Sequence, residues 1–169
     1  HAGWITIGAG MAGGADFILI PEFPISMDEV AEMIKKRHVT GRTFSIVAVA
    51  EGFKIQGLDV TQTQELDAFG HVRLGGVGEI VARELEKRTK FETRTVVLGH
   101  LQRGGAPTAF DRILGTRYGL KAVELARTGQ FGKMVALRGT EIITVDLVAI
   151  TKSKLVPREL YEDARVFFG

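Results

Sequence analysis

Hydrophobic and polar positions follow two distinct patterns along the chain. Short continuous apolar runs are typical of strands that are covered on both faces. Between them, apolar residues recur at spacings of three and four, which is typical of amphipathic helices. The runs that predict strands are 17–20, 44–50, 93–98, 133–137 and 141–145, and the segments that predict helices are 2–15, 27–38, 77–88, 108–126 and a short stretch after Pro157.

Buried strands that alternate with helices predict an α/β fold, with an open, mostly parallel sheet flanked by helices in the Rossmann-like manner. Local signals agree with the helix assignments. Ser26 is placed to cap the helix that starts at Met27, with Glu29 at the capping-box position. Thr108 follows a proline and is placed to cap the next long helix. The basic run Lys35, Lys36 and Arg37 in the last turn of helix 27–38 is expected to be a solvated face.

The amino-acid composition limits the classes of protein to which the chain can belong. Hydrophobic residues make up 45% and charged residues 25%, as in ordinary soluble globular proteins. The formal net charge of +2 argues for neither nucleic acid nor an anionic membrane. The apolar stretch 4–20 is broken by glycines and Asp16 and does not predict a membrane span. No cysteine is present, which excludes disulfides and thiolate metal sites. Because the apolar pattern is already running at His1, we expect the chain to begin inside a larger protein.

Candidate chemistry lies where predicted strands end, since ligands of open α/β sheets bind beyond the carboxyl ends of the strands. Glu51 follows the run 44–50, and His100 follows the run 93–98 after one glycine. A carboxylate there can accept hydrogen bonds from sugar hydroxyls. A histidine and an arginine can bind phosphate, the arginine through two parallel hydrogen bonds.

Residues 94–111, RTVVLGHLQRGGAPTAFD, carry the densest signal. They bring Arg94, His100 and Arg103 close together in sequence, ahead of a glycine pair that permits close backbone approach. Taken singly, the histidine could be a core residue, the arginines surface charges and the glycines a turn. As a set they favour an anion site, and the residues alone predict a phosphorylated or carboxylated small ligand.

Other polar and glycine-rich positions carry no comparable signal. The glycines at 8, 10, 13 and 14 precede a predicted strand instead of joining a strand to a helix, which argues against a dinucleotide loop. Segment 53–76 is polar and lacks a clear period, so we expect a long excursion there. We assign no ligand role to its Asp59, Asp67 and His71.

Several long motifs, in order, resemble those of the phosphofructokinase family. Residues 98–125 contain LGHLQRGGAPTAFDRILGTRYGLKAVEL, similar to the family segment with GH, an aliphatic residue, QRGG and a small residue before proline. The start, with AGGAD at 12–16 and IPE at 20–22, resembles the stretch after the family's Met-Gly-Arg motif. IVAVAEG at 46–52 is similar to the strand with the sugar-binding glutamate, and FETR at 91–94 to the strand with a substrate-binding arginine.

This resemblance implies a fructose 6-phosphate site. Glu51 would hold fructose hydroxyls, and His100 and Arg103 would bind the sugar phosphate, with Leu101 and Gln102 shaping the pocket between them. At about 3.3 Å of rise per residue, Arg94 lies roughly 20 Å of chain path before His100. In the family the matching arginine serves a neighbouring subunit, which implies a homodimer or homotetramer with sites shared across an interface.

The resemblance also implies an effector region and a division of labour. By similarity to bacterial allosteric members, Gly14, Ala15, Asp16 and Arg42 would lie where nucleotide effectors bind, although Asp16 stands where glutamate is usual. The excursion ending at 69–76 is similar to the branch that contains both ATP-using and pyrophosphate-using members. The phosphate loop, the Mg²⁺-binding aspartate and the catalytic base of the family precede this region, so no catalytic or metal-binding residue is expected here.

We therefore predict a fructose 6-phosphate-binding domain over 1–102, a segment over 103–151 that packs on a nucleotide-binding domain, and a tail over 152–169. The whole would be a cytoplasmic glycolytic phosphotransferase using ATP or pyrophosphate with Mg²⁺, and this chain alone would be inactive. Two alternatives remain open: a kinase of the same fold with another sugar-phosphate acceptor, and a non-catalytic sugar-phosphate-binding or regulatory subunit.

Overall fold

The computed structural model describes residues 2–56 and 76–168. Most of the predicted excursion 53–76 therefore lies outside the described residues. The chain divides into two compact units, the first formed by His1–Val97 with Lys154–Gly169 and the second by Leu98–Ser153. Each unit is described by itself below.

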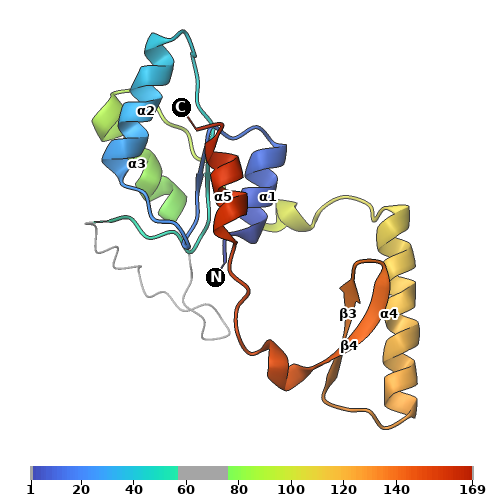
Figure 1. The fold of residues 1–169 in the computed structure, drawn as a ribbon. Helices are drawn as coiled ribbons and strands as arrows, with labels where there is room; N and C mark the ends of the chain where they lie inside the picture. The colour runs from blue at the N-terminus through green and yellow to red at the C-terminus, as the bar shows by residue number, and fades with distance from the viewer. Residues whose placement is uncertain (1, 57–75, 169) are drawn as a thin grey trace. The chain divides into compact units, whose positions relative to one another are not determined.

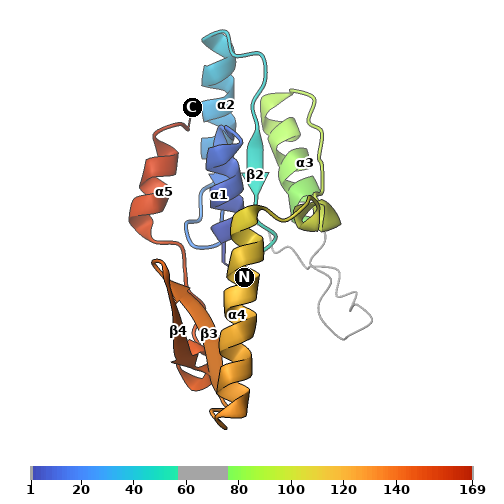
Figure 2. The same ribbon diagram turned by 90° about the vertical axis from the view of Figure 1, so that its right-hand side faces the viewer.

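The first unit consists of a small parallel sheet between two helical layers (Figures 1 and 2). Strand β1 (Phe17–Leu19) pairs in parallel with β2 (Val47–Val49). Helices α1 (Trp4–Ala12) and α5 (Arg158–Arg165) pack on one face of the sheet. Helices α2 (Met27–Val39) and α3 (Val77–Thr89) pack on the other. The arrangement is the predicted α/β architecture.

Successive side chains of β1 and the residue after it enter opposite cores. Phe17 and Leu19 join the cluster beneath α2 and α3, whereas Ile18 and Ile20 join the cluster beneath α1 and α5. Each of these side chains is at most 1% exposed. Because strand side chains alternate in direction, one short apolar strand supplies both layers of the unit.

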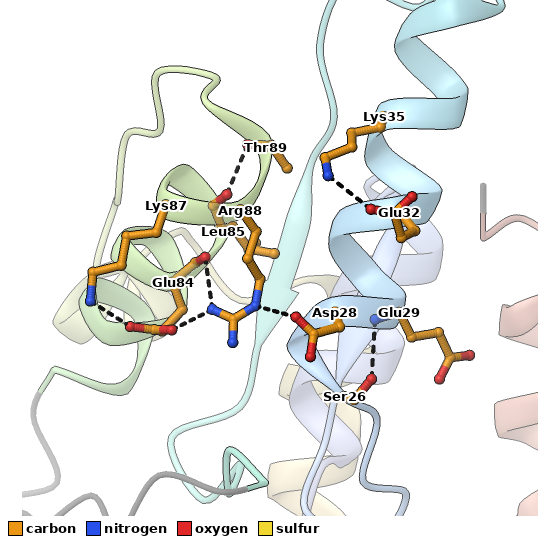
Figure 3. A network of polar contacts seen from close by, with 10 residues as sticks. All are labelled: Ser26, Asp28, Glu29, Glu32, Lys35, Glu84, Leu85, Lys87, Arg88 and Thr89. Atoms are coloured by element: carbon orange, nitrogen blue, oxygen red, sulfur yellow. Dashed lines mark hydrogen bonds and ion pairs between the residues drawn. The ribbon is translucent and has the colours of Figure 1, made fainter.

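Polar contacts stabilise α2 and α3, and one ion pair joins the two helices. The predicted cap is confirmed, because the Ser26 hydroxyl accepts a hydrogen bond from the Glu29 backbone N–H at 3.1 Å. Figure 3 shows Arg88 of α3 donating through Nε to the Asp28 carboxylate of α2, at 2.7 Å. Arg88 also pairs with Glu84, and hydrogen bonds from Lys87 and Arg88 lower the pKa of the Glu84 carboxyl.

The Glu22 carboxylate binds two other segments of the first unit, one at Gly3 and one at Val156. The backbone N–H of Gly3 donates to both of its carboxylate oxygens, at 2.9 and 3.1 Å, and the N–H of Val156 donates at 3.2 Å. The Trp4 indole N–H donates to the Lys154 carbonyl at 2.7 Å. Gly3 is required for this approach, since a Cβ built there would lie 2.4 Å from the Ile20 side chain. The returning C-terminal segment is thus held to the start of α1.

The second unit consists of the long helix α4 (Ala109–Arg127) and an antiparallel hairpin of β3 (Lys133–Arg138) and β4 (Glu141–Asp146). A 3₁₀ turn, η1 (Gly99–Arg103), precedes α4 in the chain, and another, η2 (Leu147–Ile150), follows β4. Thr108 and Asp111 form a reciprocal capping box at the start of α4. The hydroxyl and backbone N–H of Thr108 donate to Asp111 and lower the pKa of its carboxyl. Within the described residues, no helix is both long and apolar enough to cross a bilayer.

Two strand predictions were wrong in extent or kind. Residues 93–98 were predicted as a strand, but across the described parts of the chain this segment pairs with no strand, and Val96 and Val97 are 80% and 74% exposed. An apolar run becomes a strand only where a neighbour offers a ladder of hydrogen bonds. The predicted strand 44–50 shrinks to Val47–Val49, and Phe44 is 72% exposed.

Lys90 ends α3 with a φ of 65°, in the left-handed region that favours glycine. We expect Lys90→Gly to raise the free energy of unfolding by about 1 kcal/mol, because it relieves the crowding of Cβ in this conformation. Urea unfolding measures the change. Lys90→Ala is the matched control, since it removes the long side chain but keeps Cβ; an equal gain in both variants would contradict the explanation.

Candidate functional site

Glu51 is presented at the carboxyl edge of the parallel sheet. It follows β2 after one residue, Ala50, in a turn closed by the hydrogen bond from the Phe53 N–H to the Ala50 carbonyl at 2.9 Å. Ala50 and Phe53 are 7% and 4% exposed, whereas Glu51 is exposed. Two buried neighbours therefore hold the turn while the carboxylate projects to solvent, where it can accept hydrogen bonds from a ligand's hydroxyls.

A second acid, Glu22, lies at the same edge because it follows β1, which runs parallel to β2. Its oxygens are engaged by the backbone N–H groups of Gly3 and Val156. Sequence reasoning assigned Glu22 no role. In the sequence Glu22 belongs to the IPE motif at 20–22 and, like Glu51, comes shortly after a predicted strand. The contacts therefore show that Glu22 has a structural role, whereas Glu51 is exposed.

Arg94 lies on a segment that runs beside α3. The odd-numbered residues contact the helix: the Thr93 N–H donates to the Glu86 carboxylate at 3.3 Å, and the Thr95 methyl lies 3.4 Å from a Cβ built at Gly78. The Arg94 side chain projects away and is 85% exposed. It pairs with Glu92, whose Oε1 lies 3.0 Å from both Nε and Nη2.

His100, Leu101, Gln102 and Arg103 share one 3₁₀ turn, η1, in the second unit. The turn is closed by hydrogen bonds from the Leu101 N–H to the Leu98 carbonyl and from the Gly104 N–H to the Leu101 carbonyl, at 2.8 and 3.0 Å. Positive φ values at Gly99 (47°) and Gly105 (92°) bend the chain on either side. All the side chains of the turn are exposed. An imidazole and a guanidinium on one exposed turn can bind an anion.

The structure thus brings the 100–103 residues together, whereas Glu51 and Arg94 belong to the first unit and lie on different segments of it. Among residues 2–56 and 76–168, no three histidine, aspartate or glutamate side chains form a group able to hold a metal ion. A pocket of about 450 Å³ in the second unit lies between α4 and β3, lined mainly by apolar side chains such as Tyr118, Leu125 and Phe131. None of the predicted site residues lines it.

The predicted effector residues lie at the amino ends of β1 and β2, opposite to Glu51. Asp16 is only 16% exposed, and it accepts hydrogen bonds from Arg37 Nη2 at 2.5 Å and from the Ile46 N–H at 2.7 Å. Gly14 has a φ of 70°, Ala15 is buried and Arg42 is exposed. The effector role of this group stays a prediction, and any ligand of Asp16 would have to share it with Arg37.

Arg37 itself corrects an expectation. It was expected on a solvated face, but its side chain is only 13% exposed and also donates through Nε to the Ser45 hydroxyl at 3.2 Å. Helical periodicity does not reveal such a pair, because Asp16 and Ser45 lie on other segments.

Comparison with known proteins places these features in a family context. The model of the phosphofructokinase family matches residues 1–126. The chain is 54% identical to a protein of Amycolatopsis methanolica named pyrophosphate–fructose 6-phosphate 1-phosphotransferase and 48% identical to one of Mycobacterium bovis named ATP-dependent 6-phosphofructokinase. Each match covers 100% of this chain and 50% of the relative, so the chain spans about half the length of these curated relatives.

Solved structures agree on the fold. A phosphofructokinase of Pichia pastoris in the T-state matches with a TM-score of 0.66 and 30% identity, over 88% of this chain and 15% of that one. A pyrophosphate-dependent phosphofructokinase of Marinobacter aquaeolei matches with a TM-score of 0.71 and 22% identity, over 94% of this chain and 40% of that one. The predicted α/β fold of this type is confirmed.

The largely buried pair of Asp16 and Arg37 should stabilise the first unit. We expect Asp16→Asn to lower the free energy of unfolding by about 1–3 kcal/mol, because it leaves the Arg37 guanidinium without its anionic partner. The matched control is Glu32→Gln, which breaks the exposed pair of Glu32 and Lys35; their side chains are 71% and 41% exposed. This change should lower the free energy of unfolding by less than about 0.5 kcal/mol. Equal losses in urea unfolding would show that the Asp16 pair contributes no more than a surface pair.

Proposed function

The chain belongs to the phosphofructokinase family, and we propose that it supplies the sugar-phosphate site of an enzyme that phosphorylates the 1-hydroxyl of fructose 6-phosphate in glycolysis. One observation carries the proposal: the family match over residues 1–126 includes Glu51, Arg94 and the whole turn of residues 100–103. The relatives named above for this reaction are matched along the full length of the chain.

Phosphate recognition is assigned to the η1 turn. Arg103 offers a planar fork of N–H donors that matches two phosphate oxygens, and His100 adds a second donor on the same turn. Leu101 and Gln102 stand between them and shape the pocket. The chain bends at Gly105, whose φ is 92°. Glycine adopts this conformation without strain because it has no Cβ.

Glu51 and Arg94 have separate roles. Glu51 accepts hydrogen bonds from fructose hydroxyls, which fixes the sugar so that its 1-hydroxyl can meet the donor. Arg94 binds the 6-phosphate of a neighbouring subunit's site, and its outward direction and 85% side-chain exposure suit that role. The enzyme is then a homodimer or homotetramer.

The donor is ATP or pyrophosphate, since the named relatives include users of each. As the family resemblance implies, Mg²⁺ acts together with the donor and is held by the part of the enzyme that precedes this region. What this chain contributes is acceptor positioning and charge at the sugar phosphate.

Domain roles follow the same proposal. Residues 1–102 bind the sugar phosphate, residues 103–151 pack on a nucleotide-binding domain, and the tail 152–169 completes the sugar-binding part. The apolar side chains that α4 and its flanks expose in the second unit support such packing; they include Phe110, Ile113, Leu120, Val123 and Phe131. A helix that is apolar around much of its circumference is normally covered on more than one side. A cytoplasmic location fits this glycolytic role.

Arg103 provides the direct test of the phosphate site. In the full-length protein, Arg103→Ala should lower kcat/KM for fructose 6-phosphate by about ten- to a hundredfold, because a charge-assisted hydrogen bond to a phosphate is lost. Steady-state kinetics with saturating donor measure this. Arg127→Ala, an exposed arginine in the last turn of α4, is the matched control and should have little effect. An unchanged kcat/KM in the Arg103 variant would remove its assignment.

Arg94 provides the test of shared sites. Full-length Arg94→Ala and Glu51→Ala subunits should each form poorly active homo-oligomers, whereas mixed oligomers should regain part of the activity. Recovery is expected because some sites then combine an intact Glu51 from one subunit with an intact Arg94 from its neighbour. Activity is measured after subunit exchange has been verified by differently tagged subunits. Exchange without recovery would place Arg94 within its own subunit's site or outside any site.

A further inference from the structure

We propose that Glu92 is a positioning residue for Arg94, which it holds in the orientation that receives the substrate phosphate. The inference rests on the proposed function, in which Arg94 binds the 6-phosphate. It concerns a carboxylate to which no role has been assigned so far. The observations that carry it are the anchoring of the backbone at 91–95 and the geometry of the pair.

The contacts of residues 92–95 place the Glu92 and Arg94 side chains on the same face. Where side chains alternate along a segment, residues two apart project in the same direction. Thr93 and Thr95 face α3, through the contacts with Glu86 and Gly78, so Glu92 and Arg94 both face away from it. Their side chains are 74% and 85% exposed.

The backbone that carries Glu92 is fastened on both sides. The Phe91 ring lies 4.6 Å from the His38 ring, and the Phe91 N–H donates to the Thr89 hydroxyl at 3.2 Å. On the other side, the Thr93 N–H donates to Glu86, and the Thr93 hydroxyl donates to the Phe91 carbonyl at 3.3 Å. Glu92 therefore offers Arg94 an acceptor at a defined place beside the long, flexible arginine chain.

The pairing geometry leaves the phosphate-binding edge of the guanidinium available. Oε1 of Glu92 lies 3.0 Å from both Nε and Nη2, so the carboxylate takes the side edge of the guanidinium group. A guanidinium has five N–H donors, and the end formed by Nη1 and the remaining N–H of Nη2 still presents a parallel fork. That fork matches two oxygens of a phosphate. Glu92 thus orients Arg94 without occupying the edge that the substrate needs.

The opposite role is also physically reasonable and defines the test. A carboxylate near the phosphate could compete for Arg94 and repel the ligand, in which case its removal would tighten binding. An exposed ion pair contributes little, so the expected effect is modest. We expect Glu92→Ala to raise KM for fructose 6-phosphate by about two- to fivefold, with kcat and KM for the donor unchanged. Glu92→Gln keeps an oxygen acceptor and should recover part of the loss.

A double variant in the full-length protein separates the explanations. If Glu92 acts through Arg94, Glu92→Ala combined with Arg94→Ala should have the same KM for fructose 6-phosphate as Arg94→Ala alone. Glu79→Ala is the control, since this exposed acid pairs with Arg83 on α3 at 3.4 Å and should leave kinetics unchanged.

Three results would overturn the inference: an unchanged KM in Glu92→Ala, a lowered KM in both Glu92 variants, or an effect of Glu92→Ala that persists without Arg94. A wild-type KM in Arg94→Ala would remove the role of Arg94 and the inference with it. Absence of any fructose 6-phosphate phosphorylation by the unmodified full-length protein would instead refute the proposed function itself. Thermal melting of each variant checks that folding is intact.

Discussion

The burial of residues 17–20 on both faces of the sheet is the constraint on which the first unit depends. Phe17 and Leu19 fill the core against α2 and α3, while Ile18 and Ile20 fill the core against α1 and α5. The same strand fixes β2 in parallel register, and the end of β2 carries Glu51. Any shift of β1 by one residue would exchange the two faces, so the position of the candidate carboxylate is tied to the packing of both layers.

The candidate site residues are exposed side chains on backbone segments that are held by local contacts. Glu51 projects from a turn between buried Ala50 and Phe53, and Arg94 projects from a segment whose alternate residues contact α3. The η1 turn is bounded by glycines with positive φ. In each case the backbone is determined by local contacts while the polar end of the side chain remains open. A site built in this way can be completed by a ligand or by another part of the protein while its support stays in place.

Acidic residues in the first unit fall into two groups, those that accept backbone hydrogen bonds within the fold and those that are exposed. Glu22 and Asp16 lie at opposite edges of the sheet, and each accepts backbone N–H groups from segments distant in sequence. These carboxylates join the termini and the strand connections. Glu51 and Glu92 lie on the surface, where their oxygens can serve a ligand or orient a neighbouring arginine. The proposed division of roles follows from which oxygens the fold has already engaged.

The sequence by itself determined the α/β class, the extents of the main helices and the caps at Ser26 and Thr108, because periodicity and capping are local properties. Family resemblance, carried by contiguous motifs, likewise needed no coordinates. Only the tertiary structure decided that Arg37 pairs with Asp16, that the Glu22 carboxylate binds backbone N–H groups of other segments, and that residues 93–98 pair with no strand in the described chain. These outcomes depend on segments far apart in sequence. An apolar run does not show whether another strand will pair with it, and the position of an acid does not show which distant N–H group will donate to its carboxylate.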